Sequence, residues 1–383
     1  MLFKEIVGNL ITKEQLIEAV KNNRVSHAQL FSGKSGSAKL AIALAYAQFL
    51  NCENRATNDS CNTCSSCLKY NNLTHPDLHL VFPVLNTKEA RKPVSDNFIG
   101  QWRKFIANNY YSSLNDWIDS FGTENKTGQQ GTIYVDEAKK IHKKLSLKNY
   151  EADYRVVLIW MPERMDVKTS NKLLKLFEEP PKGTIFILVS ENASQLLPTI
   201  NSRMQTIKVA DFTTEDIISY FGNNILSSEK AKQLVNLTDA DLGKISQILN
   251  EKEDNLDLFS NFSSWMRLSY KMDVQGISKW VDEISGKGRK QQKLFLSYTI
   301  KMIRECLIYN FASNSLLKTN ENEHAFLTKF STFIHEGNSI LIAEKLEKSI
   351  KAINRNANAK ILFFELSLQM GKFLKVKRKF AVK

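Results

Sequence analysis

The sequence predicts a parallel α/β domain followed by helical domains. Two continuous apolar runs, Arg155–Trp160 (RVVLIW) and Thr184–Ser190 (TIFILVS), are typical of strands buried on both faces of a sheet. A helical pattern, Asn171–Glu179, lies between them and ends at two prolines, which stop a helix. After about Ala210 the strand patterns disappear, and the remainder of the chain is helical in pattern.

The first part of the chain also has an α/β pattern. Ile11–Val20 has helical apolar spacing, Ala28–Ser32 (AQLFS) indicates a short strand, and Leu40–Leu50 indicates a helix rich in Ala and Leu. A glycine-bearing loop, Gly33–Lys39, separates that strand from the helix that follows it. Strand, glycine loop and helix in this order form the arrangement that cradles phosphate groups.

Length and composition bound the class of protein. The 383 residues correspond to two or three domains at about 150 residues each. With 43% hydrophobic and 24% charged residues, the chain is not of the disordered, collagen-like or disulfide-dominated type. The 53 Lys and Arg exceed the 40 Asp and Glu, for a net charge of +13, which fits contact with nucleic acid or another polyanion.

The sequence favours a cytoplasmic protein. It has no apolar run near the roughly 20 residues that a membrane span requires, and its first residues, MLFKE, do not have the pattern of a signal peptide. We therefore expect no membrane partner. In a reducing compartment, cysteines are more often metal ligands than disulfide partners.

Four of the five cysteines form a C-x8-C-x2-C-x2-C pattern over residues 52–67: Cys52, Cys61, Cys64 and Cys67. Four thiolates in one short segment can close a tetrahedral shell around Zn²⁺. Such a shell leaves no position for a reactive water, so we expect a structural zinc site. The fifth, Cys306, stands alone in an apolar helical pattern and is expected in the core.

The glycine loop departs from a working phosphate loop, which reads G-x-x-x-x-G-K-[ST]. Gly33, Gly36 and Lys39 are present as candidate nucleotide-binding residues, but Ala38 replaces the glycine before the lysine. Leu40 replaces the hydroxyl residue that holds Mg²⁺. The pattern therefore predicts the loop shape and leaves ATP binding doubtful.

In such a site the catalytic acids lie at the end of a second strand, the Walker B strand. Two segments of this chain are candidates for it. Ile133–Glu137 (IYVDE) ends in Asp136-Glu137, whereas Arg155–Trp160 ends in an indole. Chain order favours the second, because the strand must be followed by a helix and then another buried strand. On that interpretation no carboxylate holds Mg²⁺ or polarises water, and we expect no hydrolysis in this chain.

A segment at about 84–130 differs from its surroundings. Trp102, Trp117, Tyr110 and Tyr111 stand there among polar residues, and the pattern indicates an inserted element that is not part of the sheet.

Several short motifs in the first 210 residues together carry a family resemblance. They are Val7-Gly8, His27-Ala28, Leu30–Gly33, the four cysteines, His75-Pro76-Asp77, Asn171–Lys175, Glu178–Pro181 and Leu197–Arg203. In this order they resemble the bacterial clamp-loader branch of the AAA+ proteins. Degraded Walker motifs beside an intact Ser-Arg are similar to the delta-prime subunits of DNA polymerase III.

The resemblance implies a non-hydrolysing stator in a five-subunit ring that places the sliding clamp on primed DNA. Its partners would be the ATPase motor and clamp-opening subunits. Ser202-Arg203 would then form the motif that lends an arginine to the ATP of a neighbouring subunit, although Met204 replaces the cysteine of that motif. The division implied is an AAA+ core at 1–210, a helical lid at 211–253 and a helical collar at 254–383.

Two alternatives stay open at this stage. The first is an active ATPase motor of the same assembly, with Asp136-Glu137 as its Walker B acids. The second is a zinc-stabilised nucleic-acid-binding module, in which the basic tail Lys372–Lys379 contacts DNA phosphates. A run of charge is more often a solvated surface, so we do not assign a DNA site to the tail.

Overall fold

The computed structural model describes most of the chain as two compact units, Met1–Asn250 and Glu251–Lys383. The described residues are 1–86, 93–121, 131–222, 225–250, 258–311, 317, 319, 321–354 and 357–376. Parts of the predicted insert (87–92 and 122–130), residues 251–253 of the predicted lid, and Lys377–Lys379 of the basic tail lie outside them. The three-domain division stays a prediction.

The strands, all in the first unit, are β1 (Ala28–Ser32), β2 (Leu78–Val81), β3 (Arg155–Trp160), β4 (Thr184–Ser190) and β5 (Gln205–Lys208). The helices of the first unit are α1 (Leu10–Lys21), α2 (Lys39–Leu50), α3 (Ser65–Asn71), α4 (Ile99–Asn108), α5 (Leu114–Asp119), α6 (Val135–Leu145), α7 (Val167–Glu178), α8 (Pro198–Asn201), α9 (Thr214–Phe221), α10 (Ser228–Thr238) and α11 (Leu242–Asn250). The helices of the second unit are α12 (Leu258–Lys271), α13 (Val274–Gly286), α14 (Arg289–Phe311), α15 (Glu321–Phe330), α16 (Glu336–Asn354) and α17 (Ala359–Leu374).

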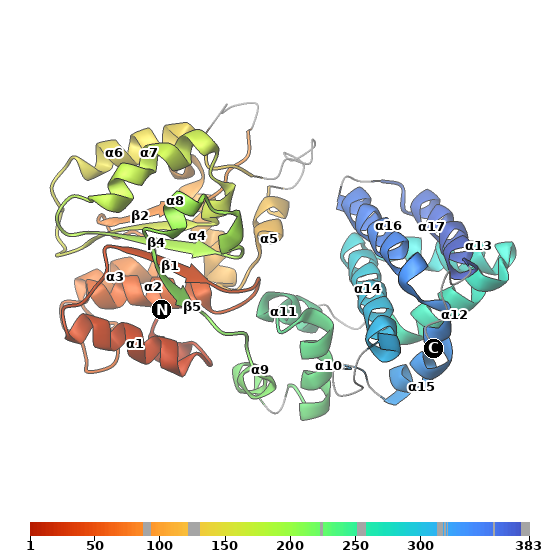
Figure 1. The fold of residues 1–383 in the computed structure, drawn as a ribbon. Helices are drawn as coiled ribbons and strands as arrows, with labels where there is room; N and C mark the ends of the chain where they lie inside the picture. The colour runs from red at the N-terminus through yellow and green to blue at the C-terminus, as the bar shows by residue number, and fades with distance from the viewer. Residues whose placement is uncertain are drawn as a thin grey trace. The chain divides into compact units, whose positions relative to one another are not determined.

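The strands form one parallel sheet in the order β2-β3-β4-β1-β5 (Figure 1). The predicted parallel α/β core and the helical remainder are confirmed. The sequence did not predict β2 and β5. The first is short and interrupted by His79, and the second is a largely exposed edge strand with no apolar run.

Helices cover both faces of the sheet, and alternate residues of each strand point to opposite layers. Val156, Leu158 and Trp160 of β3 pack in the apolar cluster that contains α1 and α2. Val157 and Ile159 pack in the cluster on the other face, which contains residues of α6, α7 and α8. This two-sided burial is why β3 and β4 are continuously apolar between their end residues.

The predicted insert is an integral part of the first unit's core. Trp102 of α4 stacks on Phe82, with ring centroids 4.3 Å apart, and lies 5.1 Å from Trp117 of α5. It also lies 4.8 Å from Trp160, the last residue of β3. The indole N–H of Trp117 donates to the carbonyl of Pro83 at 2.7 Å, which satisfies its buried polar group. The insert is therefore fixed on the carboxyl end of β3.

The insert also holds the helices that follow the sheet. The ring of Tyr111 lies 5.6 Å from those of Phe212 and Tyr220. The amide of Gln247 in α11 donates to Asp116 in α5 at 2.8 Å. A Cβ at Gly243 would lie 2.5 Å from the carbonyl oxygen of Tyr111, so only glycine permits this approach. Sheet, insert and α9–α11 thus form one packed body.

The second unit is helical throughout its described residues. Trp265 of α12 stacks on Trp280 of α13, with ring centroids 5.2 Å apart, and donates its indole N–H to Ser367 of α17. Cys306 of α14 is fully buried. In the described residues no helix is long and apolar enough to cross a membrane.

Candidate functional site

The predicted phosphate loop joins β1 to α2 at the carboxyl edge of the sheet, where ligands bind in open α/β folds. Its backbone is tied to the neighbouring strand, because the N–H of Gly33 donates to the carbonyl of Ser190 in β4. Gly36 at the apex has φ +71°, a conformation that favours glycine. Lys39 is the first residue of α2, as in a working loop.

Lys39 is engaged within the chain. Its ammonium donates to the carbonyl of Lys34 at 2.7 Å and lies 3.4 Å from a carboxylate oxygen of Glu191, which follows β4. Burial lowers the pKa of Lys39, against the opposing effect of the nearby carboxylates of Glu191, Asp241 and Glu163. Three acidic groups therefore surround the cation that would otherwise meet phosphates.

Asp241 packs against Gly36 at the loop apex. It precedes α11 and is 3% exposed. A Cβ built on Gly36 would lie 2.1 Å from its carboxylate oxygen, and the N–H of Leu242 donates to the carbonyl of Gly36 at 3.3 Å. A carboxylate of this chain thus packs on the glycine at the centre of the loop.

The carboxyl end of β3 carries no acid. Trp160 and Met161 stand there, each 1% exposed, and both pack in the cluster that contains the insert. Glu163, a little further along the chain, accepts the N–H of Glu191 at 2.9 Å.

The competing acids lie elsewhere. Asp136 and Glu137 are in the first turn of α6, not at the end of a strand of the sheet. Glu137 is buried and accepts hydrogen bonds from the N–H and hydroxyl of Ser95, while Asp136 pairs with Lys139. Burial raises the pKa of Glu137 despite those hydrogen bonds. Glu137 therefore has a structural partner in the insert.

Arg203 follows α8, on the face of the sheet opposite α2. Its Nε and Nη2 contact the carboxylate of Glu178 at the end of α7, and its Nη1 donates to the carbonyl of Thr199 at 2.7 Å. The side chain of Arg203 is 33% exposed. The hydroxyl of Ser202 donates to the same Thr199 carbonyl at 3.3 Å. The guanidinium of Arg203 therefore lies at the surface of the unit, and Glu178 and Thr199 fix its position.

The four predicted cysteines come together. The sulfurs of Cys52, Cys61, Cys64 and Cys67 lie within 4.8 Å of one another, with 3.5 Å between Cys52 and Cys61 and 3.9 Å between Cys61 and Cys67. A tetrahedral metal with bonds of about 2.3 Å to sulfur places the sulfurs about 3.8 Å apart. Backbone N–H groups of Cys61, Cys64 and Cys67 each point at a sulfur of this set. The donor set and its spacing fit a bound metal ion.

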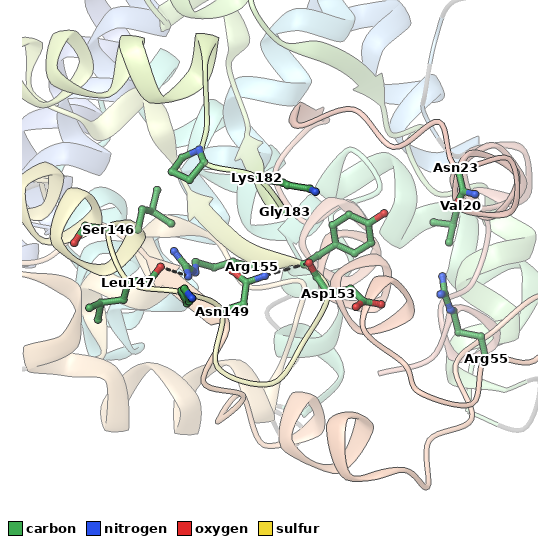
Figure 2. Close-up of a pocket in the computed structure, with 14 residues that line it drawn as sticks. Val20, Asn23, Arg55, Ser146, Leu147, Asn149, Asp153, Arg155, Lys182 and Gly183 are labelled. Atoms are coloured by element: carbon green, nitrogen blue, oxygen red, sulfur yellow. Dashed lines mark hydrogen bonds between the residues drawn. The ribbon is translucent and has the colours of Figure 1, made fainter.

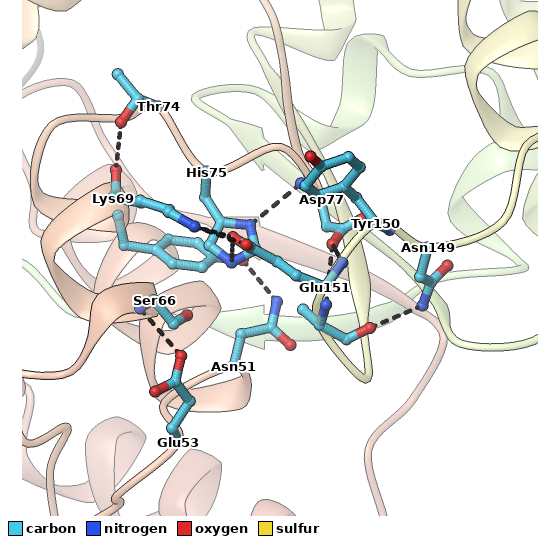
Figure 3. A network of polar contacts seen from close by, with 12 residues as sticks. Asn51, Glu53, Ser66, Lys69, Thr74, His75, Asp77, Asn149, Tyr150 and Glu151 are labelled. Carbon is cyan, nitrogen blue, oxygen red and sulfur yellow. Dashed lines mark hydrogen bonds and ion pairs between the residues drawn. The ribbon is translucent and has the colours of Figure 1, made fainter.

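His75 and Asp77 form a separate network beside that cluster (Figure 3). The carboxylate of Asp77 accepts the backbone N–H groups of Tyr150, Glu151 and Ala152 at 2.8–3.0 Å. Burial alone would raise the pKa of Asp77, but these donors outweigh it and lower that pKa. His75 accepts the N–H of Asp77 and faces Glu151 at 3.3 Å. The motif therefore joins the loop before β3 to the region of α3.

A pocket of about 760 Å³ lies at the opposite, amino edge of β3 and β4 (Figure 2). Arg55 and Lys182 line it, and Arg155 donates to the carbonyl of Leu147 in its wall. None of the predicted site residues lines this pocket, so it is distinct from the phosphate loop.

Sequence reasoning missed Asp241, Glu191 and the partner of Arg203. Asp241 is about two hundred residues from Gly36, and no spacing rule connects them. Glu178 belongs to the Glu178–Pro181 motif, which has no evident role in the sequence alone. The signal that could have identified it is an acid at the C-terminal end of a helix, where the helix dipole disfavours a negative charge.

Comparisons with known proteins find similarity to subunits of DNA polymerase III. A profile described as "DNA polymerase III, delta subunit" matches residues 8–213. The chain is 29% identical to DNA polymerase III subunit delta' of Bacillus subtilis over 225 residues, which is 58% of this chain and 54% of that protein. It is 32% identical to subunit delta' of Pseudomonas aeruginosa over 178 residues, 46% of this chain and 41% of that protein.

Another DNA polymerase III subunit is also similar. Subunit tau of Bacillus subtilis is 26% identical over 228 residues, 60% of this chain and 32% of that protein. The chain thus spans about half or less of the length of these relatives.

The close approach of Asp241 to Gly36 predicts that the loop apex does not accept a side chain. We expect Gly36→Ala to lower the free energy of unfolding of this unit by about 1–3 kcal/mol, because alanine is strained at this φ and meets the carboxylate. Gly100→Ala in α4 is the matched control, since a Cβ there meets nothing within 4 Å. Denaturant unfolding measures both, and equal stabilities would contradict the described contact.

Proposed function

We propose that this chain, which belongs to the DNA polymerase III delta subunit family and is a clamp-loader-type subunit, acts as a non-hydrolysing stator. In this role it binds no nucleotide productively and lends Arg203 to the ATP site of a neighbouring motor subunit. Two observations together carry the proposal: Trp160 stands in the place of the catalytic acid, and Arg203 is a partly exposed guanidinium whose position is fixed by Glu178 and Thr199.

The first support is the state of the chain's own phosphate loop. A Mg²⁺-nucleotide needs a cation and a Mg²⁺ ligand at the loop and an acid at the end of the neighbouring strand. Here Lys39 faces Glu191, Leu40 has no hydroxyl, and Trp160 is packed against Trp102. The negative charge of Asp241, beside Gly36 and near Lys39, would also repel a polyphosphate at this loop. Each of these features disfavours nucleotide binding and hydrolysis.

The second support is the position of Arg203. The residue belongs to the layer of α6, α7 and α8, on the other face of the sheet from α2. Its flanking residues Ile200 and Met204 are buried in that layer, so the backbone that carries the guanidinium is fixed. A partly exposed arginine on a fixed backbone fits a group that acts on a neighbour's ligand.

The chemistry of this role is electrostatic. Phosphoryl transfer builds negative charge on the equatorial oxygens of the γ-phosphate, and an arginine supplied in trans stabilises that charge. Such an arginine is worth on the order of 10³–10⁵ in rate. The subunit would therefore contribute to hydrolysis without an active site of its own.

The partners that follow from this role are the ATPase motor subunits and the clamp-opening subunit of the same assembly. DNA is handled by the whole complex, and the net charge of +13 is compatible with a place near it. Loading of the sliding clamp on primed DNA is the proposed outcome.

The four-cysteine cluster supports a second, structural part of the proposal. Four thiolates at tetrahedral spacing are the ligand set of a closed zinc site. When bound, the ion would cross-link the 52–67 segment and would have a structural role, not a catalytic one. Cys52, Cys61, Cys64 and Cys67 would hold it.

For Arg203 we expect that Arg203→Ala leaves the subunit folded and assembled, and slows DNA-stimulated ATP hydrolysis by the reconstituted complex. The expected loss is on the order of 10³-fold at the site that receives the arginine, because transition-state charge is no longer neutralised. Arg24→Ala, at another exposed arginine of the same unit, should leave hydrolysis unchanged. Normal turnover with Arg203→Ala would remove this residue from the mechanism.

For the cysteine cluster we expect about one zinc ion per chain, as a single four-thiolate site requires. Elemental analysis of protein purified without chelator measures it. Cys64→Ser should lose the ion, whereas Cys306→Ala, at the buried cysteine of the second unit, should retain it. A metal-free wild-type chain would refute the assignment.

A further inference from the structure

Arg203 and Glu178 form a paired unit at the surface of the first unit. Both Nε and Nη2 of the guanidinium contact the same carboxylate oxygen of Glu178, and the carbonyl of Thr199 accepts from Nη1. The side chain of Glu178 is 43% exposed and that of Arg203 is 33% exposed. The pair is therefore reachable from outside the chain.

The backbone segments that carry Glu178 and Arg203 are both fixed by buried neighbouring residues. Phe177, next to Glu178 on α7, is fully buried in the same apolar cluster as Ile200 and Met204. The side-chain amide of Asn201 donates to the carbonyl of Ala193 at 2.8 Å, which ties α8 to the segment after β4. These contacts fix the backbone at Glu178 and at Arg203, and the ion pair then fixes the long arginine side chain.

Fold stability gives little reason for a glutamate at this position. Glu178 is the last residue of α7, where the helix dipole disfavours a negative charge. An exposed ion pair also contributes little to folding. The pairing with Arg203 offsets the unfavourable end position, so the carboxylate is best explained by what it does to the arginine.

We propose that Glu178 is a positioning residue for Arg203, an inference that rests on the proposed function. Glu178 holds the Nε side of the guanidinium, and Thr199 holds Nη1. Nη2 keeps a second N–H for an acceptor outside the chain, such as an oxygen of a neighbour's γ-phosphate. Without the carboxylate, the arginine side chain samples other rotamers and meets the phosphate less often.

The test uses the complex reconstituted from this subunit, the motor subunits and the clamp-opening subunit. DNA-stimulated ATP turnover is measured for wild type, Glu178→Gln, Arg203→Ala and the double variant. Glu179→Gln is the matched control, because Glu179 is the adjacent exposed carboxylate and has no described ion pair with Arg203. The thermal midpoint of each isolated variant is recorded alongside.

We expect Glu178→Gln to slow turnover about ten-fold, less than Arg203→Ala, with little change in thermal midpoint. Glu179→Gln should match wild type. The double variant should be no slower than Arg203→Ala, because Glu178 has nothing to position once the arginine is gone. A purely structural role would instead give additive losses.

The measurements distinguish the role of Glu178 from the role of Arg203. One outcome is that Arg203→Ala slows turnover while the turnover rate of Glu178→Gln is equal to or higher than that of the Glu179→Gln control. That result overturns the positioning role of Glu178 and leaves the role of Arg203 in place. Additive losses in the double variant overturn the inference as well. If Arg203→Ala has no effect, the proposed function fails and the inference falls with it.

Discussion

The packing of Trp160 at the carboxyl end of β3 is the constraint on which the rest of the first unit depends. Its indole is 1% exposed and lies 4.8 Å from Trp102 of the insert. An aspartate in this place would be a buried charge with apolar neighbours, which is costly. The last residue of β3 is therefore an anchor of the aromatic core that joins the sheet to the insert.

A continuous series of packing contacts connects Trp160, through the insert, to the helices that follow the sheet. The insert is fixed on β3 by its tryptophans, and Tyr111 and Asp116 of the insert hold α9 and α11. The same α11 region sets Asp241 on Gly36. Loop, strand end and following helices therefore support one another through contacts within the chain.

The sequence predicted the features that depend on local pattern. Buried strands such as β3 are continuous apolar runs, the glycine loop follows from the residues at 33–39, and the spacing from Cys52 to Cys67 indicates one ligand set. All of these features are present in the structure at the expected places. Of the two segments considered for the Walker B strand, Arg155–Trp160 is β3 of the described sheet, and Asp136-Glu137 lie in the first turn of α6. The assignment of β3 as the Walker B strand stays a prediction.

Features set by long-range packing were not predictable. The edge strand β5 is polar and pairs only with β1 in the described sheet, so it has no apolar signature. The insert was identified by composition, but its aromatic side chains gave no sign that they cover β3. Asp241 reaches Gly36 only because α10 and α11 fold back on the loop. Such contacts join residues that no sequence period relates.

The most direct test of this account is equilibrium binding of Mg²⁺-ATP to the isolated chain, with turnover measured on the same sample. We expect neither saturable binding at millimolar nucleotide nor turnover above background. It would be contradicted by tight binding with steady hydrolysis that Glu137→Gln abolishes. That result would make the chain a motor subunit and Glu137 its catalytic acid.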